Sequence, residues 1–297
     1  MVKNSGDFSQ RHPFLFGFAV LAAVVVFMIG AMAAVRFLFL GGEGGMTGKR
    51  YGLVRIEGPI IDAEPVVEFI TGLRDDSDVA GVLIRVDSPG GVVGPAQEIH
   101  AAVKETAAVK PVVVSMGSVA ASGGYYVACP AHKIVANPGT LTGSIGVIMT
   151  MGKWKELMDR IGLTFEAITS GEMKDAGSPY RELTPKERLY FQNLVDDLHD
   201  QFVTDVADGR SMDIRKVREL ADGRIYTGRQ ARESGLVDEM GGFEVAKDML
   251  RAMTGKGNLP FDEGPVKDRG LLDMLIGVVS HIDPGKATGP RFEYTVR

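Results

Sequence analysis

The chain has 297 residues, of which 45% are apolar and 24% are charged, and these proportions are typical of a folded globular protein. Its length allows a membrane segment together with one large domain or two small ones. The net charge of −5 argues against a nucleic-acid partner, and the single cysteine excludes an intrachain disulfide framework. We interpret this residue, Cys129, as a small core residue.

The N-terminal region contains an uncharged apolar run from Phe14 to Val35. As a helix it would extend about 33 Å, and a bilayer core is about 30 Å thick. We therefore expect a transmembrane anchor at 14–40, preceded by a tail at 1–13. Ala31-Met32-Ala33 resembles a signal-peptide cleavage site, which leaves a cleaved leader as the alternative. The apolar run continues past Arg36, and this favours a retained anchor.

Three further regions are expected after the anchor. The Gly-rich segment 41–50 is typical of a flexible tether. A folded domain is expected at 51–255. The remaining segment, 256–297, is rich in proline and glycine and is expected to be a loosely ordered tail. Within that tail, the apolar patch Leu271 to Ile282 predicts a short helix on the domain or membrane surface, or a segment that reaches a partner subunit's groove.

Apolar runs of strand length alternate with helical patterns along the domain. Strands are predicted at 51–61, 79–86, 112–116, 133–136, 145–150 and 163–169. Helices are predicted at 65–73, 95–109, after Ser122, at 154–161 and from Thr184 to about Ala207. This alternation predicts an α/β fold with a largely parallel, buried sheet.

A candidate nucleophile lies in the run GSVAASGGYYVA, from Gly117 to Ala128. The hydroxyl of Ser122 falls where a strand is expected to give way to a helix, whose first backbone N–H groups are free to bind an oxyanion. Gly123 and Gly124 leave room for a substrate carbonyl. The pattern fits a nucleophilic serine, and it also fits a plain helix N-cap. The G-x-S-x-G motif of α/β-hydrolases is absent here.

A serine nucleophile needs a base, and the five histidines lie in contexts that indicate structural or solvated roles: His12, His100, His132, His199 and His281. The other candidate is Lys174, in the turn-rich loop GEMKDAGSP. An ordinary lysine has a pKa of about 10.4 and acts as a base only when it is desolvated. The residues alone leave a solvated loop lysine as the alternative interpretation.

Four segments together resemble the signal peptide peptidase A family in its short, single-domain form. They are the DSPGG turn, the run MGSVAASGGYYVA, the LTGSIGVI segment and the GEMKDAGSP loop. The stretch DGRIYTGRQARESGLVDEMGG, from Asp222 to Gly242, is similar to that family as well. The resemblance extends from about Tyr51 to about Met253. It implies a ClpP/crotonase-like α/β fold.

The resemblance also implies roles for individual residues. The serine of the family's A-S-G-G segment corresponds to Ser122 and would be the nucleophile. The lysine of its G-x-x-K-D segment corresponds to Lys174 and would be the general base. The serine of its T-G-S-I-G segment corresponds to Ser144 and would orient the lysine amine. In short family members the lysine comes from a neighbouring subunit of a ring-like oligomer, so the resemblance implies a homo-oligomer with shared active sites.

The oxyanion donors implied by the resemblance are the backbone N–H of Gly123 and that of either Gly90 or Gly91. Neutral Lys174 would take the proton of Ser122 during attack on the peptide carbonyl, and water would hydrolyse the acyl-enzyme. The substrate is expected to bind as an added strand beside the glycine turn, with its side chains in shallow apolar pockets. We expect neither a metal nor a cofactor.

The predicted function is that of a membrane-anchored serine endopeptidase which degrades cleaved signal peptides and other apolar peptides. The resemblance implies a single-pass protein of the bacterial inner membrane with its catalytic domain on the extracytoplasmic side. Three alternatives share the fold: a related membrane-bound ClpP-class protease with a membrane protein substrate, a crotonase-like acyl-CoA enzyme, and a non-catalytic assembly protein. The presence of both Ser122 and Lys174 in the family's motifs favours the protease.

Overall fold

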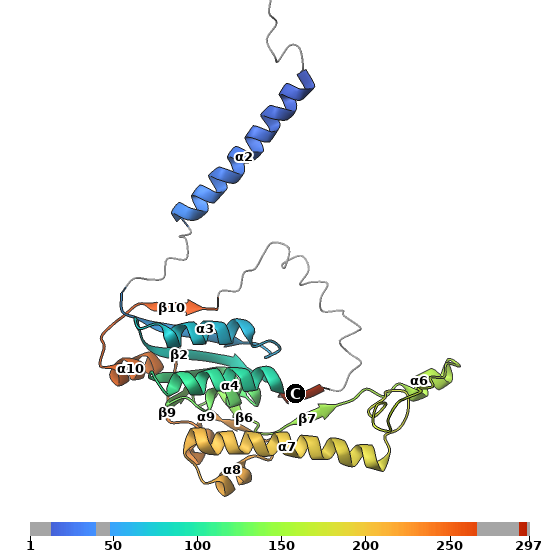
Figure 1. Ribbon diagram of the computed structural model, residues 1–297. Helices are drawn as coiled ribbons and strands as arrows, with labels where there is room; N and C mark the ends of the chain where they lie inside the picture. The colour runs from blue at the N-terminus through green and yellow to red at the C-terminus, as the bar shows by residue number, and fades with distance from the viewer. Residues whose placement is uncertain (1–12, 40–47, 266–290, 296–297) are drawn as a thin grey trace, which may run out of the picture. The chain divides into compact units, whose positions relative to one another are not determined.

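The computed structural model describes residues 13–39, 48–265 and 291–295 (Figure 1). The chain divides into two compact units, Met1–Gly48 and Lys49–Arg297. Nearly all of the predicted N-terminal tail, most of the Gly-rich tether and the whole apolar patch from Leu271 to Ile282 lie outside the described residues.

The described part of the first unit is the helix α2 (Pro13–Phe39), of 27 residues, whose sequence carries a single charge at Arg36. Among the residues that the structure describes, no helix combines the length and apolar character that crossing a membrane requires. The anchor at 14–40 therefore stays a prediction.

The second unit is built on an eight-stranded sheet with the order β10-β1-β2-β4-β5-β9, in which β6 pairs with β4 and β8 pairs with β6. The strands are β1 (Arg50–Glu57), β2 (Val79–Ser88), β4 (Val112–Ala121), β5 (Lys133–Ala136), β6 (Leu141–Gly143), β8 (Ile225–Thr227), β9 (Glu239–Met240) and β10 (Phe261–Gly264). Every pairing is parallel except that of β6 with β8. The predicted α/β fold with a largely parallel sheet is confirmed.

Helices cover both faces of this sheet. They are α3 (Glu64–Asp75), α4 (Val93–Ala107), α5 (Gly123–Ala128), α7 (Pro185–Arg210), α8 (Ile214–Leu220), α9 (Gly228–Ser234) and α10 (Phe243–Thr254). Alternate side chains of β2 enter different cores: Val82 and Ile84 join the core that includes α3, α4, α5 and α7, whereas Leu83 joins the smaller core with α10. Strands buried on both faces are continuously apolar, which explains why the sequence revealed them.

A second, three-stranded sheet lies beside the first and has the order β3-β11-β7. Its strands are β3 (Gly90–Val92), β7 (Ile148–Thr150) and β11 (Arg291–Thr295), and both of its pairings are antiparallel. The region beyond Gly255 was expected to be loosely ordered. Two described parts of this region are ordered strands: β10 in the large sheet and β11 in the small one (Figure 1).

The strand predicted at 163–169 is wrong, because these residues form no regular secondary structure. Both Phe165 and Ile168 are exposed to solvent, with 98% of Ile168 exposed. A strand is stabilised by a neighbouring strand, and no described part of the chain pairs with this segment.

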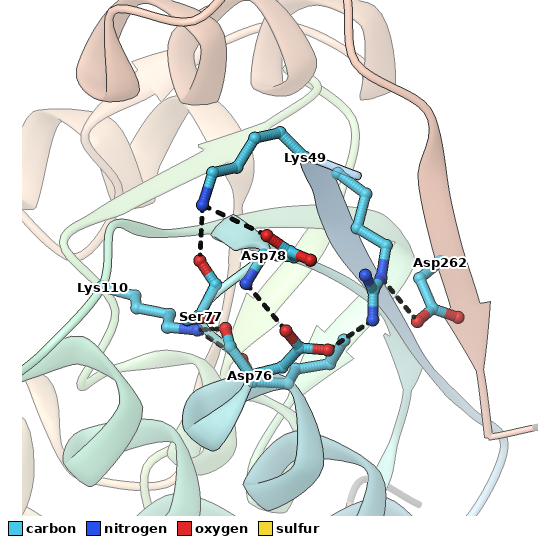
Figure 2. Close-up of polar contacts among 8 residues, drawn as sticks. Lys49, Asp76, Ser77, Asp78, Lys110 and Asp262 are labelled. Atoms are coloured by element: carbon cyan, nitrogen blue, oxygen red, sulfur yellow. Dashed lines mark hydrogen bonds and ion pairs between the residues drawn. The ribbon is translucent and has the colours of Figure 1, made fainter. Parts of the chain in front are cut away.

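Ion pairs connect the beginning of β1 to β10 and to the loop before β2 (Figure 2). The guanidinium of Arg50 is only 7% exposed and forms ion pairs with Asp76 and, at 3.1 Å, with Asp262 of β10. The neighbouring Lys49 pairs with Asp78 at 3.3 Å. These contacts join β1, β10 and the loop before β2 at the point where the second unit begins.

The segment 151–183, which contains α6 (Lys155–Arg160), forms an extension between β7 and α7 (Figure 1). Arg181 joins the last turn of this extension to the start of α7. The guanidinium donates to Asp175 at 2.7 Å and to both carboxylate oxygens of Glu187, at 2.6 and 2.9 Å. Glu187 also accepts from the backbone N–H of Thr184, which completes the predicted helix cap as a capping box.

The Glu187 carboxylate should make the stability of the extension depend on pH. The Arg181 guanidinium and the Thr184 N–H hold the pKa of Glu187 at about 2, below its ordinary value of 4.5. The ionised carboxylate therefore contributes fully to the unfolding free energy above about pH 4.5, and this contribution is lost as the pH falls towards 2. At pH 7 we expect Glu187→Gln to lower the unfolding free energy by about 1–3 kcal/mol, measured by urea denaturation.

Glu172→Gln is the matched control, because this carboxylate forms an exposed ion pair with Lys186. We expect it to change the unfolding free energy by about 0–1 kcal/mol. The difference in unfolding free energy between the Glu187→Gln variant and the unaltered chain should shrink as the pH falls from 4.5 to 2. A difference that stays constant over this range would contradict the assignment.

Candidate active site

The backbone makes a sharp turn at Ser122, between the last residue of β4 and the first of α5. Ser122 has φ 54° and ψ −118°, values that a residue with a side chain adopts only at a cost of about 1–3 kcal/mol. Two hydrogen bonds hold the turn: Ser122 N–H donates to the Gly143 carbonyl at 2.7 Å, and Tyr126 N–H donates to the Ser122 carbonyl at 2.8 Å. The neighbouring elements therefore impose the strained conformation.

The hydroxyl of Ser122 is buried and unsatisfied. The residue is 1% exposed, and its Oγ has no hydrogen-bond partner among the described residues. A buried polar group without a partner costs about 1–3 kcal/mol, so such groups are uncommon and often functional. Strain and an unused hydroxyl at one residue argue against a plain helix cap, whose side chain would accept a backbone hydrogen bond.

Three glycines bring their backbones together beside this serine. A Cβ placed on Gly123 would lie 3.1 Å from the Cα of Gly90 and 3.2 Å from the nitrogen of Gly91. Gly90 has φ +97°, a conformation that glycine adopts without strain. Its N–H donates to the Ser88 hydroxyl at 3.1 Å, so this donor is already engaged.

Ser144 lies at the end of the strand next to the Ser122 turn. Strands β4 and β6 pair in parallel, with Ala121 opposite Gly143, so the two serines follow directly after paired residues. Ser144 also has a positive φ, 51°, and is 8% exposed. Its N–H donates to the Arg224 carbonyl at 2.8 Å. The structure thus brings Ser144 to the same end of the sheet as Ser122.

Lys174 lies in the extension and is exposed to solvent. It borders a cavity of about 640 Å³ that is lined only by residues 165–167 and 174–181. Its amine forms no hydrogen bond or ion pair with any described residue. Because the Ser122 hydroxyl also has no partner, the two proposed catalytic groups are not hydrogen-bonded to each other within the single chain.

Two histidines of the folded domain, His100 and His132, were the other candidate bases, and neither is hydrogen-bonded to the Ser122 hydroxyl. The His100 ring stacks on Tyr126 with ring centroids 4.6 Å apart, and burial lowers the pKa of His100. Nδ1 of His132 accepts the backbone N–H of Val112 at 3.2 Å. Both rings are engaged in packing or backbone hydrogen bonds, in agreement with the structural roles expected from the sequence.

The C-terminal strand β11 also reaches the site, which no sequence motif indicated. The carbonyl oxygen of Tyr294 lies 3.1 Å from the position that a Cβ on Gly123 would take. The available signal was the alternation of Phe292, Tyr294 and Val296 with polar residues, a period typical of a half-buried strand. The surrounding proline- and glycine-rich composition obscured it.

Comparison with known proteins shows the family of the chain. Residues 104–256 match the profile of peptidase family S49. The chain is 44% identical to a protein from Synechocystis sp. named as a protease, over 61% of this chain and 65% of the relative. It is 43% identical to a protein from Enterococcus faecium named as a signal peptide peptidase SppA, over 62% of this chain and 54% of the relative. The chain thus spans about half to two thirds of these relatives.

Among solved structures, a ClpP1 mutant from Listeria monocytogenes is similar, with a TM-score of 0.44 and 17% identity over 65% of this chain and 93% of that chain. The profile match covers about half of the sequence and includes both Ser122 and Lys174. The resemblance to a peptidase family that the sequence motifs indicated is therefore confirmed, and the chain belongs to peptidase family S49.

Proposed function

We propose that the chain is a serine endopeptidase in which Ser122 attacks the peptide carbonyl and Lys174 of a neighbouring copy acts as the general base. The observation that carries the proposal is the strained, 1% exposed Ser122 whose hydroxyl has no partner. The hydroxyl stands at a strand-to-helix turn next to a cluster of backbone glycines, an arrangement suited to acyl transfer.

The backbone N–H groups of Gly123 and Gly91 are the proposed oxyanion donors. Gly123 directly follows the nucleophile, and the Gly91 nitrogen lies 3.2 Å from the position of a Gly123 Cβ. The N–H of Gly90 already donates to the Ser88 hydroxyl, which favours Gly91 over Gly90. Two fixed donors at this position would stabilise the negative charge of the tetrahedral intermediate.

The exposed position of Lys174 supports delivery of the base from a second copy of the chain. An amine in water is mostly protonated near neutral pH, and burial favours its neutral form. Apolar side chains are exposed on the same extension: Trp154, Leu157, Ile161, Leu163, Phe165 and Ile168. Packing of this surface against a neighbour would cover these side chains and remove water from the amine. Ser144, at the end of the sheet, is the proposed partner that would orient that amine.

We propose cleaved signal peptides and other apolar peptides as substrates, because one relative is named as a signal peptide peptidase. Membrane attachment through α2 would suit such substrates: its 27 residues extend about 40 Å at about 1.5 Å per residue. Tethering to the bilayer would raise the encounter rate with membrane-borne peptides. The family resemblance implies the bacterial inner membrane, with the catalytic unit on the extracytoplasmic side.

Replacement of either proposed catalytic residue should abolish turnover. The assay uses the full chain in detergent and a fluorogenic signal-peptide fragment as substrate. We expect Ser122→Ala and Lys174→Ala each to lower kcat/KM by about 100- to 10,000-fold. Lys153→Ala is the control, because Lys153 lies on the same extension and forms an exposed ion pair with Glu182. Sedimentation should show the same assembly for all variants. Wild-type turnover by Lys174→Ala would exclude Lys174 as the base.

Mixing the two inactive variants distinguishes a lysine from a neighbour from one within the chain. After dissociation and joint reassembly of Ser122→Ala and Lys174→Ala chains in equal amounts, a shared site would regain about a quarter of wild-type activity, because half of the sites keep Ser122 and half of these face an intact lysine. The measurement is peptide hydrolysis by the mixture. If the lysine acted within its own chain, the mixture would stay as inactive as its components.

A further inference from the structure

We propose that Asp87 and Thr140 are positioning residues that hold a bulge in β4, and that this bulge sets the place of the Ser122 hydroxyl relative to the glycine turn. The inference rests on the proposed function and extends it to residues outside the proposed catalytic set. Two observations carry it: a shift in register between β2 and β4, and the side chains that bind the backbone groups of the bulge.

The pairing of β2 with β4 contains two extra residues on the β4 side. Up to Val86 the two strands advance together, but the next paired residue, Ser88, lies opposite Ala120, so two steps along β2 correspond to four along β4. Counting on from this pair brings Gly90 level with Ser122. In an unshifted ladder Ala120 would be level with Gly90, and Ser122 would lie two residues, about 7 Å, further along. The bulge therefore determines which residue meets the glycine turn.

The strand β4 changes its other partner at the same place. On the side away from β2, residues 113–115 pair with β5 and residues 119–121 pair with β6. Residues 116–118 are paired with neither of these strands. Backbone N–H and C=O groups that leave a ladder inside a protein need other partners, and here side chains of the neighbouring strands supply them.

The Asp87 carboxylate is the acceptor for the bulge. Its Oδ1 accepts the N–H of Val119 at 3.0 Å. A Cβ on Gly117 would lie 2.6 Å from the Cγ of Asp87 and 2.7 Å from its Oδ2, so only glycine at position 117 leaves room for this carboxylate. Asp87 forms no ion pair with any residue that the structure describes. Its role is therefore to accept one N–H rather than to neutralise a cation.

Two threonine hydroxyls are the donors. Thr140, which is 2% exposed, donates from Oγ1 to the Gly117 carbonyl at 2.7 Å. Thr142 donates in the same way to the Ala120 carbonyl at 2.6 Å. A buried backbone group that loses its partner is costly, so removal of one side chain should shift the segment until the group finds another. Such a shift would be passed to Ser122, because the segment ends at the turn that carries it.

Peptide hydrolysis by the full chain in detergent measures the effect on the proposed nucleophile. We expect Asp87→Ala to lower kcat by about 10- to 100-fold, because a displacement of about 1 Å at the reacting atoms can cost about 100-fold. Asp87→Asn keeps an acceptor oxygen in the same place, so its kcat should stay within about threefold of that of the unaltered chain.

Asp213→Ala is the matched control for Asp87→Ala. The Oδ1 of Asp213 also accepts one backbone N–H, that of Arg215 at 2.8 Å, but it does so at the start of α8. Its replacement should leave kcat unchanged. At the second position, Thr140→Val removes the hydroxyl and should lower kcat by about 3- to 10-fold, the value of one neutral hydrogen bond. Thr140→Ser keeps the hydroxyl and should restore kcat.

Hydrogen exchange reports on the bulge without any need for activity. In mass spectrometry of fragments that cover residues 117–122, Asp87→Ala should raise the exchange rate by about tenfold, because the Val119 N–H loses its acceptor. Asp87→Asn and Asp213→Ala should leave this rate unchanged. Unchanged exchange in Asp87→Ala would overturn the inference, and so would an equal loss of kcat in Asp87→Ala and Asp87→Asn. If exchange changes as expected but the unaltered chain hydrolyses no peptide, the proposed function fails and the bulge contacts stand.

Discussion

The close approach of backbones around Ser122 is the constraint on which the rest of the site depends. The strained turn is held by the Gly143 carbonyl on one side and by the first turn of α5 on the other. A Cβ on Gly124 would lie only 2.6 Å from the Ser88 carbonyl oxygen, so α5 and the turn after β2 are in direct backbone contact. The parallel sheet makes this possible, because the carboxyl ends of β2, β4 and β6 lie at one edge. Strain at Ser122 is balanced by packing of the whole sheet.

The proposed nucleophile and the proposed base belong to parts of the chain with different surroundings. Ser122 lies among buried strands and helices, whereas Lys174 lies on an extension whose apolar side chains are exposed. The extension is internally well connected, since Arg181 joins Asp175, next to Lys174, to Glu187 of α7, and Glu187 also accepts the backbone N–H of Thr184. A fixed loop with an exposed apolar surface is suited to contact a second copy. If Lys174 acts on Ser122 of a neighbouring copy, as proposed, an isolated chain would be inactive until it assembles.

The sequence was most informative where burial determines the pattern. The continuous apolar runs at 79–86, 112–116 and 133–136 correspond to β2, β4 and β5. Strands that are buried on both faces consist mainly of apolar residues. Thr184-Pro185 marked a helix start, and the capping box confirmed it. The segment 163–169 misled because alternation indicates a strand only when a partner strand exists. No local pattern showed that the last residues return to the Ser122 turn, because the partners of β11 lie far away in the sequence.

Motifs also identified residues that the fold brings together, but they did not describe the shape of the space around them. The glycines of the DSPGG turn and the serine of the ASGG segment meet as the resemblance implied, because their strands are neighbours in the sheet. Signal peptides have small residues near their ends, and the expectation drawn from them was of shallow pockets. Beside Gly91, the chain's own Tyr294 fills the space next to the rings of Tyr126 and Phe202, so the expectation of shallow substrate pockets stays a prediction.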